Sequence, residues 1–200
     1  MNKNKKRKAL ILIGGGGHCR SSIDVIETTL DWEIKGIIDN KIPTGELVSG
    51  YKILGSDDKI EFFQKKDYFF LITIGFIKDS DLRFSIINKL KALKCKFATI
   101  ISPLAYVSKN AKIGKGSILM HKSIVNTNSI IGQNSIINTS ALIEHDSIIG
   151  NNVHVSTGAI INGSCQIGSN SFIGSNCVIV QNTILNEKAF VKAGSVKNNG

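Results

Sequence analysis

The chain has 200 residues, of which 42% are hydrophobic, with 19 glycines, two prolines and a formal net charge of +10 at pH 7. This length and composition predict a globular protein of one or two domains, and no apolar run approaches the roughly 18 residues of a membrane-spanning helix. The basic opening MNKNKKRK precedes an apolar run too short for a signal peptide, so the sequence favours a cytoplasmic protein.

The cysteines and the basic residues point away from disulfides, zinc and nucleic acid. Cys19, Cys95, Cys165 and Cys177 lie far apart, without a CxxC pair or histidines at zinc-finger spacing, and are expected to be reduced thiols. Five of the 25 basic residues fall in the first eight positions and predict a solvated arm: Lys3, Lys5, Lys6, Arg7 and Lys8. The remaining positive charge suits a polyanionic small molecule such as a nucleotide, whereas no basic face interleaved with aromatic residues indicates nucleic-acid binding.

The first half of the chain begins as a nucleotide-binding βαβ unit would. KALILIGGGGHCRSSIDVIETTL predicts a strand, a glycine-rich turn and a helix, and WEIKGIID predicts a second strand that ends at Asp39. Gly14 and Gly16 fit a dinucleotide fingerprint, but Cys19 stands where the third glycine belongs, so a plain strand-to-helix turn stays open. DYFFLITIG and DLRFSIINKLKALK continue the alternation. Residues 1–103 are therefore predicted to form a Rossmann-like domain, short enough to favour a mononucleotide moiety.

The second half repeats with a period of six. Every sixth residue from Val107 to Val191 is aliphatic, and the residue two positions before each is nearly always small. Since side chains of a strand alternate between faces, both positions point inward and the residue between them points outward. The pair Ile-Gly recurs every eighteen residues, at 113–114, 131–132, 149–150 and 167–168, so three hexads make one coil of a triangular prism over residues 104–200. The pattern resembles the left-handed parallel β-helix of hexapeptide-repeat acyltransferases, and the handedness rests on that resemblance.

The outward positions form three largely apolar rows. They are Ile118, Ile136, His154, Phe172 and Phe190; Ile124, Leu142, Ile160 and Val178; and Ile130, Ile148, Gln166 and Ile184. Contiguous apolar stripes of this length predict that the prism packs against copies of itself. His154 interrupts one row and is expected to face a cleft between subunits.

His145 is the strongest catalytic candidate. Gly163 follows it by eighteen residues and thus lies one rung above it, which is expected to open space over the imidazole and to offer a backbone N–H to a carbonyl oxygen. Asp146 is expected to hold the imidazole tautomer, and Asn138 to contact substrate. The alternative is a solvated corner histidine without a task. His121 has no such neighbours and is predicted to be a surface residue.

Together these features resemble the sugar acetyltransferases of the NeuD/PglD type, through GGGGHCR, IIDN, YKILGSD, INTSALIEHD and HVSTGAIING. The resemblance implies that a Rossmann-like domain binding a nucleotide sugar precedes a left-handed β-helix that binds acetyl-CoA between the subunits of a homotrimer. It implies that His145 is the general base, that Asp146 orients it and that Asn138 and His154 contact substrate. Further implied contacts are Ser156, Gly163 and Gly174 to acetyl-CoA, and Gly14, Gly15, Gly16, Gly17, His18, Arg20, Asp39 and Asn40 to the nucleotide sugar.

The implied reaction is acetyl transfer from acetyl-CoA to the amino group of a nucleotide-linked 4-amino-6-deoxysugar, in surface glycan biosynthesis. O-acetylation of a sialic or related nonulosonic acid is the closest alternative. A metal-dependent hydratase using His121, His145 and His154 and a non-catalytic scaffold are less favoured, and no metal site is predicted. Family members commonly continue past a phrase like AGSV into a Gly-x-Pro-Ala-type tail, whereas this sequence reads VKNNG there, which leaves the affinity for coenzyme A open.

Overall fold

The computed structural model describes residues 7–78 and 80–199. It divides into two compact units, the first formed by Met1–Ile74 with Leu82–Ala98 and the second by Gly75–Asp81 with Thr99–Gly200. The arm predicted at the start of the chain falls, at Lys3, Lys5 and Lys6, outside the described residues. No helix of the described ranges has the length and hydropathy needed to cross a membrane.

The first unit is a six-stranded sheet with helices, in the strand order β3-β4-β2-β1-β5-β6. All neighbouring strands run parallel except the pair β3–β4. The strands are β1 (Lys8–Ile13), β2 (Trp32–Ile38), β3 (Leu47–Val48), β4 (Tyr51–Gly55), β5 (Phe69–Ile72) and β6 (Lys96–Phe97). Since β2 and β5 flank β1 on opposite sides, the chain switches direction across the sheet at β1, and the carboxyl edge there is where nucleotides bind in folds of this class.

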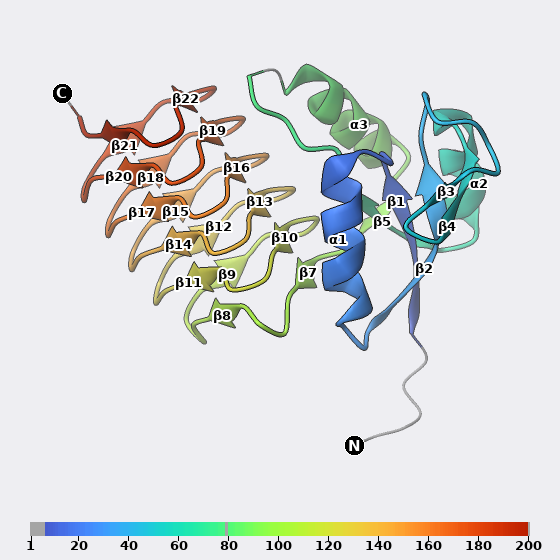
Figure 1. The fold of residues 1–200 in the computed structure, drawn as a ribbon, viewed down its shortest axis with the longest axis horizontal. Helices are drawn as coiled ribbons and strands as arrows, with labels where there is room; N and C mark the ends of the chain where they lie inside the picture. Colours follow the sequence, from blue (N-terminus) through green and yellow to red (C-terminus); the bar gives the residue numbers. More distant parts are fainter. Residues whose placement is uncertain (1–6, 79, 200) are drawn as a thin grey trace. The chain divides into compact units, whose positions relative to one another are not determined.

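The helices connect these parallel strands, as the predicted alternation requires (Figure 1). They are α1 (Gly17–Glu27), a short 3₁₀ turn η1 (Asp57–Lys59), α2 (Ile60–Lys65) and α3 (Asp81–Ala92). Apolar side chains of β1, β5, α2 and α3 form one core on the sheet, among them Ile11, Phe70, Ile60 and Ile87. Leu10 and Leu12, on the other face of β1, are equally buried, so both faces of the sheet are covered, as a parallel sheet requires.

The second unit is a parallel β-helix of three sheets, each built from strands of two residues that stack coil upon coil (Figure 1). Sheet 1 contains β7 (Ile100–Ile101), β10 (Ile118–Leu119), β13 (Ile136–Ile137), β16 (His154–Val155), β19 (Phe172–Ile173) and β22 (Phe190–Val191). Sheet 2 contains β8 (Tyr106–Val107), β11 (Ile124–Val125), β14 (Leu142–Ile143), β17 (Ile160–Ile161), β20 (Val178–Ile179) and β23 (Val196–Lys197). Sheet 3 contains β9 (Lys112–Ile113), β12 (Ile130–Ile131), β15 (Ile148–Ile149), β18 (Gln166–Ile167) and β21 (Ile184–Leu185).

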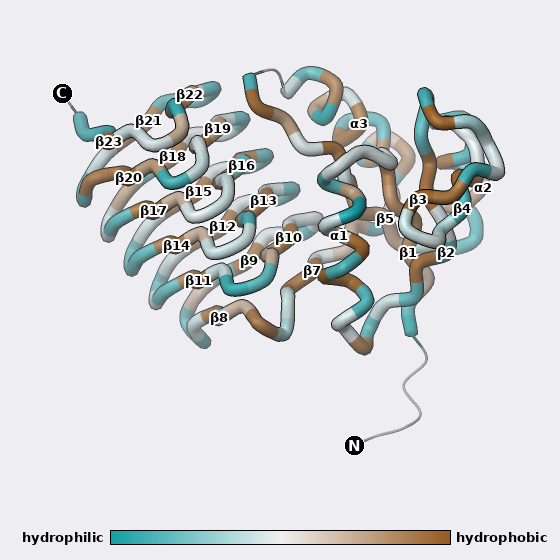
Figure 2. The backbone as a smooth tube through the Cα atoms, viewed as in Figure 1, coloured by the Kyte–Doolittle hydropathy of each residue, from teal (hydrophilic) through white to brown (hydrophobic). Residues whose placement is uncertain are grey.

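Strand partners are eighteen residues apart throughout, for example Ile118 with Ile136, which confirms three hexads per coil. The inward aliphatic residues and the small residues two positions before them form the core, and the strands stand out as brown segments in Figure 2. The β-helix begins before the predicted boundary at residue 103, because Ile100 already pairs with Ile118 as the first rung of sheet 1.

The corners follow a second rule that the hexad count did not reveal. Every sixth residue from Gly116 to Gly194 has a positive φ, and most of these residues are asparagine, serine or glycine. Asparagine and aspartate tolerate the left-handed conformation better than other side chains with a Cβ. The recurring Ile-Gly glycines serve another purpose, since a Cβ on Gly114 would lie 2.5 Å from the backbone carbonyl carbon of Gly132 in the next coil. Close approach between coils, rather than left-handed backbone, excludes a side chain there.

The outer rows differ in exposure, which corrects the expectation that all three face copies of the chain. In sheet 1, Ile118, Ile136, His154 and Phe172 are at most 8% exposed, whereas Phe190 in the last rung of the same row is 48% exposed. The rows of sheets 2 and 3 carry more exposed side chains, as Ile124, Ile148 and Ile184 illustrate at 37%, 44% and 60% exposure. Apolar surface suited to a partner therefore lies mainly on the rows of sheets 2 and 3.

Candidate active site

His145 and Asp146 form a hydrogen-bonded pair at the corner between sheets 2 and 3. His145 Nδ1 lies 2.8 Å from Asp146 Oδ2. An ionised carboxylate only accepts hydrogen bonds, so the pair fixes the tautomer with a proton on Nδ1 and leaves the lone pair of Nε2 available. Both side chains are about half exposed, 47% for His145 and 50% for Asp146. A neutral imidazole that offers Nε2 to solvent is arranged to accept a proton.

Gly163 lies directly over the imidazole ring, as the eighteen-residue spacing predicts. A Cβ at this position would stand 2.6 Å from His145 Cε1 and 2.7 Å from Nε2. The space that was predicted to be open is therefore filled by the imidazole. The ring can lie against the next coil only because Gly163 has no side chain. The Gly163 carbonyl accepts a hydrogen bond from Asn182, while its N–H makes none within the described part of the chain. The backbone N–H of the residue that packs against the imidazole is thus left without a protein acceptor in the described ranges.

Asn128 is a member of this site that the sequence interpretation missed. Its Nδ2 donates to Asp146 Oδ1 across 3.1 Å, so the two carboxylate oxygens of Asp146 bind Asn128 and His145 respectively. Asn128 lies eighteen residues before Asp146, and both occupy the left-handed corner position, with φ of 60° and 59°. The spacing that located Gly163 above His145 would also have located Asn128 below Asp146, had it been counted downward.

These two hydrogen bonds keep Asp146 ionised. The bond from His145 and, after it, the bond from Asn128 hold the pKa of the Asp146 carboxyl below its usual value. The pairing is therefore fully present above the ordinary carboxyl pKa of about 4 and is lost only as the pH falls through the lowered value. Titration of Asp146 should not shape activity near neutral pH.

Replacing Asp146 by asparagine is expected to lower kcat by roughly 10- to 100-fold. This is the rate factor that corresponds to the free energy of one charge-assisted hydrogen bond. Asparagine accepts the left-handed backbone at this corner, so folding should be preserved, whereas alanine would add strain. Steady-state kinetics should show unchanged KM for both substrates. An unchanged kcat would mean that Asp146 does not orient the base.

Asn138 and His154 form a second group, between β13 and β16 of sheet 1. His154 Nδ1 lies 2.8 Å from the Phe76 carbonyl oxygen, and its Nε2 lies 3.4 Å from Asn138 Nδ2. A carbonyl only accepts, so Nδ1–H donates to Phe76, and Nε2 faces the Asn138 amide. The Phe76 and Phe172 rings contact the imidazole edge-on. His154 is expected to face a cleft between subunits; in this chain Phe76 lies against it and it is 8% exposed, so its role in such a cleft stays a prediction.

The remaining predicted contacts to acetyl-CoA lie in tightly packed coils. Ser156 is 9% exposed, and its hydroxyl lies 2.8 Å from that of Ser175. Gly174 is buried, and a Cβ there would lie 2.4 Å from the backbone nitrogen of Ala193. Their roles toward a ligand stay predictions.

The three histidines of the hydratase alternative have separate partners. His121 Nδ1 lies 2.6 Å from the Ser102 hydroxyl, while His145 pairs with Asp146 and His154 with Phe76. Across the described ranges, no group of three or more His, Cys, Asp or Glu side chains is placed to hold a metal ion. All four cysteines are buried, free thiols.

The glycine loop follows β1 at the carboxyl edge of the sheet in the first unit. Gly14 has φ of +98°, and a Cβ there would lie 2.3 Å from Ile74 Cγ1, so only glycine fits. Gly16 and Gly17 are exposed, and a Cβ on either would meet no atom within 4 Å. Gly16 precedes α1, whose first turn carries no acidic residue. An exposed helix N-terminus next to open glycines is a suitable place for a phosphate.

Asp39 fastens this loop to the end of β2. Its Oδ2 accepts the Gly15 N–H at 2.7 Å, and its Oδ1 accepts the N–H groups of Lys41 and Ile42. Burial opposes ionisation of Asp39, but these three backbone donors outweigh it and lower the pKa of the carboxyl. Asn40 accepts the N–H of Asp57. Both residues thus shape the edge where the resemblance places base and ribose.

His18 and Arg20 lie in the first turns of α1. His18 is half-buried, and its carbonyl accepts a hydrogen bond from the Ser22 hydroxyl. Arg20 is exposed. The structure therefore brings the predicted nucleotide-sugar residues together around one loop, whereas Asn138 with His154 and His145 with Asp146 form separate groups on the β-helix.

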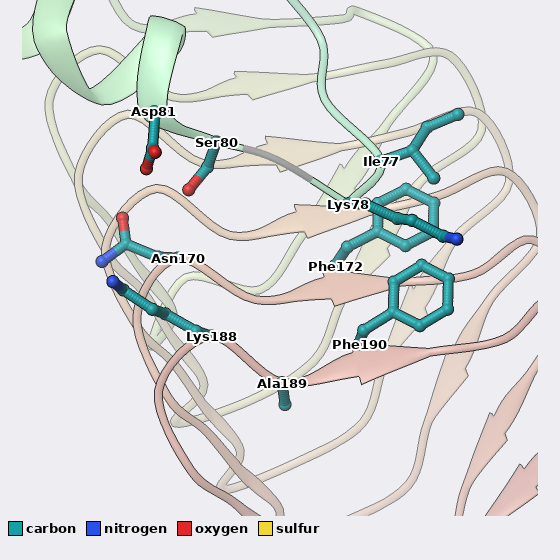
Figure 3. A pocket seen from close by; sticks show the side chains of 9 residues that line it. All are labelled: Ile77, Lys78, Ser80, Asp81, Asn170, Phe172, Lys188, Ala189 and Phe190. Atoms are coloured by element: carbon teal, nitrogen blue, oxygen red, sulfur yellow. The ribbon is translucent and has the colours of Figure 1, made fainter.

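A cavity of about 260 Å³ lies elsewhere in the second unit, beside the last coils of sheet 1 (Figure 3). The stacked rings of Phe172 and Phe190 form one wall, and Lys78, Lys188 and Asp81 line the rest. None of the predicted catalytic or nucleotide-binding residues lines it, although Phe172 and Phe190 belong to the same outer row as His154. The cavity is therefore not the candidate active site.

The fold and the His–Asp corner define a class, the left-handed β-helix proteins of the hexapeptide acetyltransferase type. Residues 9–90 match the model of the PglD N-terminal domain family, which confirms the resemblance seen in the sequence. UDP-N-acetylbacillosamine N-acetyltransferase of Bacillus subtilis is 30% identical over 116 residues, or 56% of this chain. The match spans 51% of that relative, about half its length.

Solved structures match nearly the whole chain. The acetyltransferase domain of PglB from Neisseria gonorrhoeae, in complex with acetyl coenzyme A, has a TM-score of 0.85 at 25% identity, covering 97% of this chain and 95% of that one. A mutant of perosamine N-acetyltransferase from Caulobacter crescentus, in complex with CoA and GDP-perosamine, has a TM-score of 0.88 at 24% identity, covering 94% and 88%. At 24% identity, the similarity to perosamine N-acetyltransferase shows only a shared fold. Both confirm the predicted order of a Rossmann-like unit followed by a β-helix.

Proposed function

We propose that this protein transfers an acetyl group from acetyl-CoA to the amino group of a nucleotide-linked 4-amino-6-deoxysugar. The observation that carries the proposal is the His145–Asp146 pair with Nε2 beneath Gly163. The neighbours named above act on nucleotide-linked amino sugars or bind acetyl-CoA, and they share this fold. The proposal includes a cytoplasmic location and a role in surface glycan biosynthesis.

In the proposed mechanism the acceptor amine attacks the thioester carbonyl of acetyl-CoA while His145 Nε2 takes its proton. Asp146 stabilises the imidazolium that forms, and Asn128 holds Asp146 in place. The Gly163 N–H donates to the oxyanion of the tetrahedral intermediate. Collapse of this intermediate releases the CoA thiolate, which recovers a proton, and leaves the amide.

The acceptor is assigned to the first unit. Its diphosphate is placed on Gly16, Gly17 and the N-terminus of α1, at the carboxyl edge where the sheet changes direction. Asp39 and Asn40 border the same edge and suit the nucleoside. Binding the nucleotide part of one substrate and the coenzyme A part of the other would convert a bimolecular encounter into a reaction between groups held in fixed positions.

An acetyltransferase assay with a panel of acceptors tests the reaction. Acetyl-CoA is supplied with UDP-, dTDP- and GDP-linked 4-amino-6-deoxysugars, and with free and CMP-linked nonulosonic acids, while CoA release is followed. We expect turnover with one of the amino sugars and an N-acetylated product by mass spectrometry. Turnover only with a nonulosonic acid would identify an O-acetyltransferase instead, and no turnover with any acceptor would contradict the proposal.

Replacing Gly16 by leucine is expected to weaken nucleotide-sugar binding by at least about 10-fold and to leave acetyl-CoA binding within about twofold. Gly16 has φ of −74° and open surroundings, so leucine fits the fold but covers the place assigned to phosphate. Calorimetric titration with each ligand and a melting curve check this. Equal losses for both ligands at an unchanged melting temperature would show that the domain assignment is wrong.

The protein is proposed to be a homotrimer, because the open rows of sheets 2 and 3 are apolar in this chain. Analytical ultracentrifugation should give a mass of about 65 kDa, three times 21.7 kDa. A stable monomer at micromolar concentration would contradict the proposed homotrimer.

A further inference from the structure

The peptide bond between Gly14 and Gly15 is held at both ends. The Gly14 carbonyl accepts the Thr73 hydroxyl at 2.7 Å, and the Gly15 N–H donates to Asp39 Oδ2 at 2.7 Å. In a trans peptide the C=O and N–H groups point in opposite directions, so Thr73 and Asp39 fix the same plane from its two sides. The orientation of this plane sets the direction in which the chain enters Gly16, Gly17 and α1.

Thr73 is placed for this task by its position directly after β5. It is 1% exposed, and its N–H and its hydroxyl both lie within hydrogen-bond distance of the Ile13 carbonyl, at 2.8 and 2.9 Å. The next residue, Ile74, packs where a Gly14 side chain would be. The ends of β1 and β5 are thus fitted to each other residue by residue.

Arg83 holds Thr73 from the opposite side. This arginine of α3 is 1% exposed, and its Nη1 donates to the carbonyls of Ile72 at 2.9 Å and Ile74 at 2.6 Å, the two residues that flank Thr73. Carbonyls two residues apart in an extended chain point the same way, so one guanidinium nitrogen can bind both. Burial lowers the pKa of Arg83 to about 9, which still leaves the group charged at neutral pH.

Cys19 lies at the start of α1, where the nucleotide fingerprint would have its third glycine, and it is fully buried. Burial raises the pKa of this thiol to about 11, so it is protonated at neutral pH.

We propose that Thr73 and Arg83 are positioning residues that fix the glycine loop and thereby set the affinity for the nucleotide diphosphate. The ligand named here rests on the proposed function, whereas the ordering of the loop does not.

The decisive variant is Thr73→Val, which keeps the shape of the side chain and removes the hydroxyl. Amide hydrogen exchange at Gly15 should become roughly 5-fold faster, and the Kd of the nucleoside diphosphate that wild type binds best among UDP, dTDP and GDP should rise by roughly the same factor, as loss of one hydrogen bond predicts. The Kd of acetyl-CoA should not change. Thr73→Ser, which retains the hydroxyl, should restore both values.

Thr29→Val is the matched control, because the Thr29 hydroxyl also donates to a backbone carbonyl, that of Ile26 at 2.7 Å, but at the far end of α1. It should leave Gly15 exchange and diphosphate affinity as in wild type. Wild-type exchange at Gly15 in Thr73→Val, or equal losses in Thr73→Val and Thr73→Ser, would overturn the proposal. If wild type binds none of the three diphosphates, the proposed nucleotide site fails, and the exchange rates alone decide whether the network orders the loop.

Discussion

Replacing His145 by alanine is expected to lower kcat by about 10²- to 10⁴-fold, the usual contribution of a positioned general base. The side chain is 47% exposed at a corner and contributes nothing to the inner stack of aliphatic residues, so the β-helix should keep its stability. KM for both substrates should change little, because the base acts mainly in the transition state. Steady-state kinetics near neutral pH, where a protonated amine needs the base most, and a melting curve measure the two effects.

His121→Ala is the control, since His121 is another β-helix histidine, whose Nδ1 lies 2.6 Å from the Ser102 hydroxyl. It should retain kcat within about twofold. His154→Ala should act more through KM than through kcat, because its ring is fixed to Phe76 and faces Asn138. If His145→Ala turns over normally while His154→Ala is inactive, the two roles are exchanged.

Replacing Gly163 by alanine should lower kcat by about 10²-fold without unfolding the protein, since displacing a reacting group by about 1 Å can cost that much. Its φ is not in the left-handed region, so the added Cβ acts only through contact, 2.6 to 2.7 Å from the imidazole. The imidazole, which is half exposed, can swing away and relieve the clash. The expected signature is a large loss of rate with a small loss of stability.

Gly114→Ala is expected to show the opposite signature. A Cβ there would meet the backbone of the next coil at 2.5 Å, and backbone cannot swing away. Its melting temperature should fall while kcat of the remaining folded enzyme stays normal. Should Gly163→Ala also lose stability and keep its rate, the contact with His145 would be structural only.

Most of the β-helix could be predicted from the sequence because its period is expressed in residue types. The inward aliphatic residues, the small residues two positions before them and the eighteen-residue period can all be read in the sequence. The period placed Gly163 above His145. The sequence does not show which outer residues are buried by another segment of the same chain. Phe76, 78 residues away from His154, lies on that imidazole, and no local pattern announces so distant a contact.

In the first unit the strand, turn and helix of the glycine loop were predictable from spacing and residue type. The hydrogen bonds that hold that loop were not, because Asp39 and Thr73 reach it from the ends of β2 and β5, and Arg83 of α3 binds the residues on either side of Thr73. The mismatch at Cys19 was visible, but its complete burial in the folded unit was not.

The corner that carries His145 contains no hinge. Its neighbours come from the coils directly below and above, at 128 and 163, and each coil is tied to the next by backbone hydrogen bonds such as Asp146 N–H to the Thr127 carbonyl and Ser164 N–H to the His145 carbonyl. Close-packed stacks of this kind do not deform continuously. The backbone that carries the imidazole is therefore in place before any substrate arrives, and differences in rate between acceptors should arise from how well each amine is delivered to Nε2 rather than from rearrangement of this corner.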